Sequence, residues 1–390
     1  MQAKTQDNNQ KGRSREDSYL EALKVLSYNG KASFDTIAKV LHTTKTTAYN
    51  QFKDLVDEYG LKFVPEINID GIWKYEFIKF TRPHKKREIV EEALESLPDA
   101  IGFEEYMILI KFLNGKPKNE EILNAISNSY EAQFVATLDG EYDLVMYVVA
   151  RNYMEADRFL LSFDEKMSKY NIVSEMDRIM PAFGFFPLSK KLIERFNIPE
   201  SYLDLLLGLS DNGREELKAI AAKFKREPDR IMYAMERLRD TGILKHVTYY
   251  EEKPKYNVRA LIKLTTNNVS AFLKNRNKWF LDMVKDQGRH NEYIFVADIS
   301  NPTGILMFMN FETKKDLSSF VKRLSDNLKV IKTTTIGIKD VLVGHLGVRN
   351  FDMRYSMQYE ILANQNLVPK MKKEPKEIEE EYKEEKDLLD

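Results

Sequence analysis

Five polar side chains recur at helical spacing, and their types suit contact with double-stranded DNA. They are Lys45, Thr46, Tyr49, Asn50 and Lys53. Asparagine can bind adenine bidentately, threonine can contact a base edge or a thymine methyl group, and lysine can meet phosphate or guanine. No acidic residue interrupts this row before Asp54. An ordinary solvated helix face is the alternative, and we favour DNA recognition because of the neighbouring helices.

The segments around this row have the order of a winged helix-turn-helix. The predicted elements are helices at residues 17–28, 33–41 and 45–58 and a wing of two strands at 61–77. Thr44 is the expected N-cap of the third helix, and with Thr47 it completes the candidate DNA contacts. The wing is expected to turn at Asp70-Gly71, because Asp-Gly is a preferred hairpin turn.

A second group of chemically capable residues forms a turn between two short apolar runs, 134–138 and 144–150. The turn residues are Asp139, Gly140, Glu141, Tyr142 and Asp143. A glycine turn brings backbone amides together, and the carboxylates beside it give a combination that suits an amino-acid zwitterion. These residues are therefore candidates for a small-molecule effector site. The alternative is a structural turn in which Gly140 supplies only the backbone conformation.

This hairpin sits inside a longer pattern of strands and helices. A strand is predicted from residue 107, helices near 118–126 and 156–167, and a closing strand at 172–180. The order βαββαβ is that of a ferredoxin-like unit. Its two helices cover one face of the sheet, so we expect the open face to dimerise or to bind a ligand.

The whole arrangement then repeats. Asp17-Ser-Tyr-Leu20 is matched by Glu200-Ser-Tyr-Leu203, and Leu55 is matched by Leu238, in each case 183 positions later. A constant offset over this length indicates an internal duplication. The fold class expected is α+β, with two winged helix-turn-helix domains alternating with two ferredoxin-like domains.

The duplication also sets the expected domain boundaries. They are a disordered tail at 1–16, winged helix-turn-helix domains at 17–80 and 191–258, a helical connector at 81–106, ferredoxin-like domains at 107–190 and 259–350, and a charged C-terminal extension at 351–390. The two ferredoxin-like units are expected to pair their open faces within the chain, and two chains are expected to associate further.

The Leu138-Asp-Gly-Glu-Tyr-Asp-Leu144 turn, following a helix-turn-helix, resembles the Lrp/AsnC family of transcriptional regulators, whose second domain is the RAM module. The resemblance covers nearly the whole chain twice, although family members are typically single copies. It implies a DNA-binding regulator that forms homo-oligomers and is modulated by an amino-acid-like effector. The second copy has Ser300-Asn-Pro-Thr-Gly304 in place of the acidic turn, so an effector is expected in the first copy.

The second recognition helix presents a different row of side chains. Its members are Pro228, Asp229, Met232, Tyr233 and Glu236. Carboxylates facing phosphates are repelled, so the first helix-turn-helix is expected to supply most of the sequence reading. Arg226 and Arg230 beside this helix are candidates for contacts with the DNA backbone.

An alternative function for the protein is a weakly specific architectural DNA-binding or assembly protein. A DNA footprint distinguishes it from a regulator, because a regulator protects a defined site and an architectural protein coats DNA evenly.

Composition excludes several other classes. The 390 residues contain no cysteine, which removes disulfides and thiolate chemistry, and the net charge of −1 argues against indiscriminate binding of polyanions. We expect no cofactor, no metal, no signal peptide and no membrane span, and a cytoplasmic protein.

Some proteins that resemble this family are siroheme decarboxylases, which use histidine and arginine near a porphyrin. The five histidines here are scattered, so we expect no enzyme.

Overall fold

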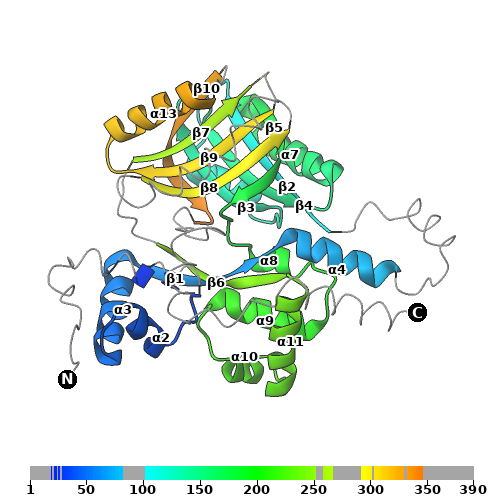
Figure 1. Ribbon diagram of the computed structural model, residues 1–390. Coiled ribbons are helices and arrows are strands. Elements are labelled where there is room, and N and C mark those ends of the chain that lie inside the picture. The colour runs from blue at the N-terminus through cyan, green and yellow to red at the C-terminus, as the bar shows by residue number, and fades with distance from the viewer. Residues whose placement is uncertain are drawn as a thin grey trace, which may run out of the picture.

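The computed structural model describes residues 29–81, 102–251, 258–266, 291–300, 303–328 and 332–345, and positions Tyr19, Ala22, Leu23, Val25 and Leu26 of the first helix. A barrel of strands lies above a group of short helices in Figure 1, with a two-stranded ribbon between them. The predicted tail 1–16, most of the connector 81–106, the second-copy helix near 268–287 and the extension 351–390 lie outside the described residues.

Both helix-turn-helix units are present. Their helices are α2 (Phe34–Val40) and α3 (Lys45–Tyr59) in the first copy, and α9 (Glu200–Asp211), α10 (Leu217–Lys223) and α11 (Pro228–Asp240) in the second. Each turn contains one left-handed residue, His42 with φ 51° and Lys225 with φ 53°, again 183 positions apart. Because non-glycine residues seldom adopt this conformation, the shared turn confirms that the two units have the same local structure.

The predicted wing is wrong. Strand β1 (Leu61–Ile67) pairs antiparallel with β6 (Leu244–Glu251) of the other copy, and residues 69–81 form helix α4 (Ile69–Thr81). The side chain of Asn68 accepts a hydrogen bond from the N–H of Asp70 at 3.2 Å, and Ile69 and Ile72 are buried at helical spacing. Asp70-Gly71 therefore begins a helix, in which Gly71 lets the backbone of Gly242 approach closely.

The two copies hold each other through reciprocal backbone contacts. The N–H of Gly30 donates to the carbonyl of Val247 at 2.6 Å, and the N–H of Gly213 donates to the carbonyl of Phe63 at 2.8 Å. Each copy thus places its Asn-Gly turn on the ribbon strand of the other. The two helix-turn-helix units form one interlocked body with approximate two-fold symmetry.

The upper body contains both ferredoxin-like units. The first consists of β2 (Glu104–Phe112), α6 (Asn119–Ile126), β3 (Ala132–Asp139), β4 (Leu144–Ala150), α7 (Tyr153–Met167), a 3-10 turn (Ser168–Tyr170) and β5 (Ile172–Phe183). The second consists of β7 (Val258–Thr265), β8 (Asn291–Ser300), β9 (Thr303–Phe311), α13 (Lys314–Leu328) and β10 (Lys332–Val343). Helix α8 (Lys190–Ile193) lies in the segment that leads from β5 to the second helix-turn-helix.

The two sheets join edge to edge into one closed antiparallel barrel, in the order β10-β3-β4-β2-β5-β8-β9-β7. The two open faces, which the sequence predicted to pair, both line the barrel interior. Phe186, from the segment after β5, fills this interior, with ring centroids 4.8 Å from Phe134, 4.7 Å from Tyr147 and 4.8 Å from Phe295. The barrel is therefore a packed core.

The outer surface of each half carries its own helices, α6 and α7 on one half and α13 on the other (Figure 1). Both open faces and the edges of both sheets are used in contacts within the chain. If two chains associate as predicted, they must therefore do so through a surface other than these faces and edges. Among the described helices, none is long and apolar enough to cross a lipid bilayer.

Candidate nucleic-acid interface

Helix α3 presents the predicted row to solvent. Lys45, Thr46, Tyr49, Asn50 and Lys53 are all exposed, as are Thr44 and Thr47. The hydroxyl of Thr44 accepts a hydrogen bond from the N–H of Thr47 at 3.2 Å, which caps the helix as predicted. The N-terminus of α3 is fixed by this cap, so the row projects from an ordered first turn.

The opposite face of α3 anchors the helix. Ala48 and Leu55 are buried, and the ring of Phe52 lies between Phe34 and Phe63, with centroids at 5.3 and 5.8 Å. Lys45 forms an ion pair with Asp35 at 2.9 Å, but both side chains are exposed. Exposed pairs of this kind are weak, so Lys45 can exchange this partner for a phosphate.

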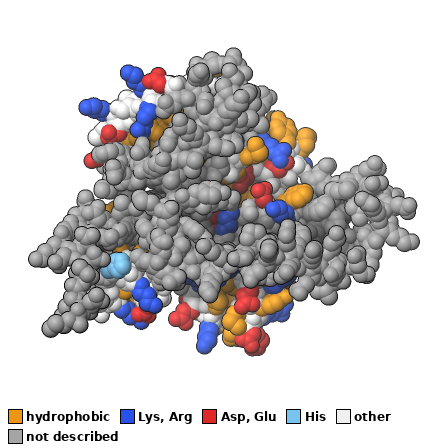
Figure 2. Space-filling model, in the orientation of Figure 1, with side chains coloured by type: hydrophobic (Ala, Val, Ile, Leu, Met, Phe, Trp, Pro, Cys, Tyr) orange, Lys and Arg blue, Asp and Glu red, His pale blue; other side chains and the backbone are white. Residues whose placement is uncertain are grey.

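Helix α11 is built on the same plan with a different outer face. Ile231, Ala234 and Leu238 are buried, whereas Met232 and Tyr233 are 51% and 57% exposed. Asp229 and Glu236 are also exposed. Figure 2 shows hydrophobic, acidic and basic side chains mixed along the lower edge, over α10 and α11. The described part of the second copy thus lacks the uniformly polar, cationic row of α3.

The two arginines predicted to grip the DNA backbone differ in their surroundings. Arg226 donates to Asp204 at 2.6 Å and to Glu200 at 2.8 Å, and these carboxylates raise the pKa of its guanidinium. It therefore ties the turn before α11 to α9, and a phosphate would compete with both acids. Arg230 is exposed, and its contact with the DNA backbone stays a prediction.

Arg214 has a role that the sequence did not reveal. Its guanidinium lies over the rings of Phe34, Phe52 and Phe63, and it donates to the carbonyls of Gly30 and Ala32 in the other copy. Burial lowers the pKa of this guanidinium. Arg214 thus belongs to the second copy but supports the helix that carries the first recognition row. In the sequence, only its place in the repeated Asn-Gly motif gave a signal.

The predicted effector turn is held by contacts within the first ferredoxin-like unit and borders β10 of the second. Asp143 accepts a hydrogen bond from the N–H of Phe112 at 2.9 Å and pairs with Lys116 at 2.7 Å. Gly140 has φ 156°, and a Cβ added there would lie 3.1 Å from the side chain of Ile336. These contacts favour the structural alternative for the turn, while the effector site at Asp139, Gly140, Glu141, Tyr142 and Asp143 stays a prediction.

Tyr142 leads from this turn to a charged cluster. Its hydroxyl donates to Glu175 at 2.5 Å, and the ammonium of Lys263 contacts both Glu175 and Asp177, the latter at 2.7 Å. Lys263 and Asp177 are buried. Burial and the neighbouring Glu175 carboxylate raise the pKa of Asp177 above its usual value, while Lys263 partly opposes this. The cluster links the two halves across the barrel, and the sequence gave no sign of it because the partners lie 86 residues apart.

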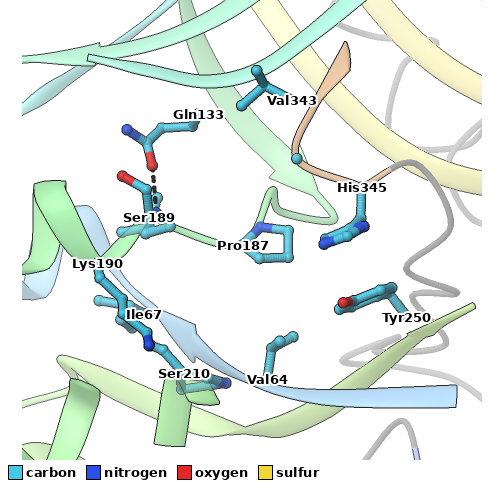
Figure 3. A pocket seen from close by; sticks show the side chains of 13 residues that line it. Val64, Ile67, Gln133, Pro187, Ser189, Lys190, Ser210, Tyr250, Val343 and His345 are labelled. Carbon is cyan, nitrogen blue, oxygen red and sulfur yellow. Dashed lines mark hydrogen bonds between the residues drawn. The ribbon is translucent and has the colours of Figure 1, made fainter. Parts of the chain in front are cut away.

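A cavity of about 230 Å³ lies between the ribbon and the barrel (Figure 3). Tyr250 and His345 stack at one end with ring centroids 3.9 Å apart. At the other end the N–H of Ser189 donates to the side-chain carbonyl of Gln133 at 2.6 Å, near Lys190. Its walls are mainly apolar, and no three His, Asp or Glu side chains gather as a metal site anywhere in the described part of the chain.

No protein-family model and no curated protein match the sequence. Among solved structures, the siroheme decarboxylase NirDL is similar, with a TM-score of 0.52, 10% identity, and coverage of 90% of this chain and 99% of that chain. NirDL in complex with an iron-uroporphyrin III analogue gives a TM-score of 0.52 at 9% identity, with coverage of 90% and 98%. LrpC of B. subtilis covers 37% of this chain and 96% of its own, with a TM-score of 0.30 and 17% identity.

The chain shares the overall fold of NirDL. Because the likeness to NirDL extends over 90% of the chain, it includes both helix-turn-helix units and both halves of the barrel. At 10% identity it concerns the arrangement of elements and carries no assignment of activity.

Proposed function

We propose that the chain is a sequence-reading DNA-binding protein of the regulator type, and that α3 is its principal reading helix. The observation that carries this proposal is the exposed row from Lys45 to Lys53. It contains cationic, hydroxyl and amide groups and no carboxylate. Such a row, on the third helix of a helix-turn-helix with a capped N-terminus, matches the donors and acceptors of the major groove.

Two variants test the proposal, because one removes a sequence-specific contribution to the DNA affinity and the other removes an electrostatic one. Asn50→Ala removes a base contact and is expected to weaken binding to the preferred DNA by about 1–3 kcal/mol. Lys53→Ala removes a phosphate contact, so it should weaken binding to all sequences and reduce the slope of log affinity against log salt by roughly one. Fluorescence anisotropy with DNA selected from a random pool measures both.

The matched control is Lys322→Ala, which removes an exposed lysine from α13 on the barrel. It should leave both the affinity and the salt slope unchanged. If Asn50→Ala and Lys53→Ala behave like this control, α3 is not the reading helix and the proposal fails.

Tetrapyrrole chemistry is the second candidate, supported by the full-length likeness to NirDL. The barrel interior is occupied by aromatic rings, and the cavity beside the ribbon, about 230 Å³, is smaller than the roughly 300–1,000 Å³ typical of sites for drug-sized ligands. Absorbance spectroscopy of the protein with siroheme decides between the two candidates. We expect no saturable shift of the pigment band; a saturable shift at one pigment per chain would favour the second candidate.

A further inference from the structure

The two recognition helices of this chain occupy equivalent places but present different chemistry. At the offset of 183 residues, Asn50 of α3 corresponds to Tyr233 of α11, and Tyr49 corresponds to Met232. The acids Asp229 and Glu236 stand where α3 has Thr46 and Lys53. All of these side chains are exposed, so burial in the core does not dictate their types.

The face of α11 matches pyrimidine edges in the major groove. A carboxylate can accept a hydrogen bond from the amino group of cytosine, and apolar side chains contact the methyl group of thymine. Asp229 lies in the first turn of α11, and the half-exposed Met232 and Tyr233 follow one turn later. The N-terminal part of a recognition helix is the part that meets base edges, so all three stand in the reading position.

Basic residues border this face and offset its two acids. Lys225 and Arg230 are exposed near the start of α11, and Arg239 is exposed near its end. These cations can meet phosphates on the flanks of the groove while the carboxylates face the bases. Phosphate contacts position a helix without selecting a sequence. Asp229, Met232 and Tyr233 therefore determine which base sequence α11 selects.

Both faces are presented from one interlocked body. The ribbon pairing of β1 with β6, the reciprocal contacts of Gly30 and Gly213, and the partly buried Arg214 fix the two helix-turn-helix units together. A dimer of identical chains reads two identical half-sites. In this chain the two-fold arrangement is kept, but the reading side chains differ.

Resting on the proposed function, we infer that the chain recognises a non-palindromic DNA site with two unlike half-sites. The half-site under α3 contains adenine for Asn50. The half-site under α11 has a pyrimidine-rich strand, whose cytosine amino groups meet Asp229 and whose thymine methyl groups meet Met232 and Tyr233.

Selection of bound sequences from a random DNA pool tests the first part. Enrichment of two unlike half-sites, one of them pyrimidine-rich, is expected for the full-length protein. A palindromic site overturns this inference but leaves the proposed function intact. Failure to enrich any sequence overturns the proposed function itself, so the two failures are distinguishable.

Replacement of thymine by uracil, which lacks the methyl group, tests the second part on the selected site. Uracil in the α11 half-site should weaken binding roughly fourfold per contacted methyl group, the equivalent of about 0.8 kcal/mol for a buried methylene-sized group. The double variant Met232→Ala, Tyr233→Ala should lose this sensitivity. Tyr153→Ala, which removes an equally exposed aromatic ring from α7, should keep it.

Two results would overturn the assignment of the α11 face. One is equal affinity of the wild-type protein for thymine-containing and uracil-containing half-sites. The other is uracil sensitivity that survives in the Met232→Ala, Tyr233→Ala variant, because the methyl groups would then be read by other residues. A face that docks a protein partner instead predicts the first of these results.

Discussion

The carboxylate of Glu76 on α4 lies 2.8 Å from the guanidinium of Arg151, which follows β4, and this ion pair joins the helical body to the barrel. The same carboxylate accepts hydrogen bonds from the N–H groups of Gly102 at 2.8 Å and Asn197 at 3.0 Å. Arg151 in turn donates to the carbonyl of Arg195 at 2.6 Å. The segments that enter and leave the barrel therefore meet at one buried carboxylate.

Loss of Glu76 should destabilise the protein strongly. Glu76→Ala removes the carboxylate that pairs with the largely buried Arg151 side chain, 18% exposed, and that accepts hydrogen bonds from the N–H groups of Gly102 and Asn197. Removal of one partner from a buried pair costs about 3–5 kcal/mol. Chemical denaturation of Glu76→Ala, Arg151→Ala and the double variant measures the coupling. If the two single effects simply add in the double variant, the pair does not act as a unit.

The glycines that interlock the two helix-turn-helix units should tolerate no side chain. A Cβ at Gly213 would lie 2.7 Å from the backbone carbon of Phe63, and one at Gly30 would lie 2.9 Å from the carbonyl oxygen of Val247. Overpacking of this kind typically costs about 1–3 kcal/mol. We expect Gly30→Ala and Gly213→Ala each to lower the melting temperature.

The control for this prediction is Gly337→Ala in β10, where a Cβ would lie at an ordinary 3.6 Å from the carbonyl oxygen of Asp139. It should leave the melting temperature unchanged or slightly raised, because alanine loses less backbone entropy on folding than glycine. Equal melting temperatures for all three variants would contradict the close packing at the two Asn-Gly turns.

Local features of this fold could be predicted from the sequence, and distant pairings could not. The capped helix α3 was predictable because its spacing and its Thr44 cap are encoded within one segment. The partner of β1 was not, because its nearly continuous run of buried residues fits many partners and the true one, β6, lies 183 residues away. Asp70-Gly71 predicts a hairpin turn, but the segment forms a helix instead, because a helix buries Ile69 and Ile72.

The candidate site shows the same division. The exposed row of α3 follows from helical periodicity and stays exposed in the fold. The roles of Arg214 and Lys263 could not be predicted from the sequence, because each depends on a partner that is distant along the chain. Arg214 is 182 residues from Ala32, and Lys263 is 86 residues from Asp177. A lysine in an apolar strand gives a weak signal of a buried ion pair, but no sequence pattern names its partner.

Phe186 should be essential for the barrel. Its ring fills the interior and lies within 5.4 Å, centroid to centroid, of four aromatic rings. Phe186→Ala leaves a cavity, and truncation of a buried phenylalanine costs about 3–5 kcal/mol. Thermal unfolding measures the loss, with Phe186→Leu expected to lose less. A variant Phe186→Ala that is as stable as the wild type would show that the interior is filled by other groups.

Glu105 on β2 should make stability depend on pH near neutrality. Burial raises the pKa of this carboxyl from its ordinary value of 4.5 to about 8, helped by Asp70 and opposed by the hydrogen bond with Tyr147 and by Lys245. Its Oε2 atom is buried and has no hydrogen-bond partner among the described residues. The neutral carboxyl is therefore the form that suits the folded barrel.

The sign of the effect follows from proton linkage. Between pH 4.5 and about 8 the folded protein holds a proton on Glu105 that the unfolded chain has released, so the free energy of unfolding falls as the pH rises. The stabilisation is complete below pH 4.5 and is lost as the pH passes through about 8. Glu105→Gln carries no charge at any pH, so its melting temperature should vary less between pH 5 and 8. Parallel pH profiles for the two proteins would show that Glu105 ionises normally in the fold.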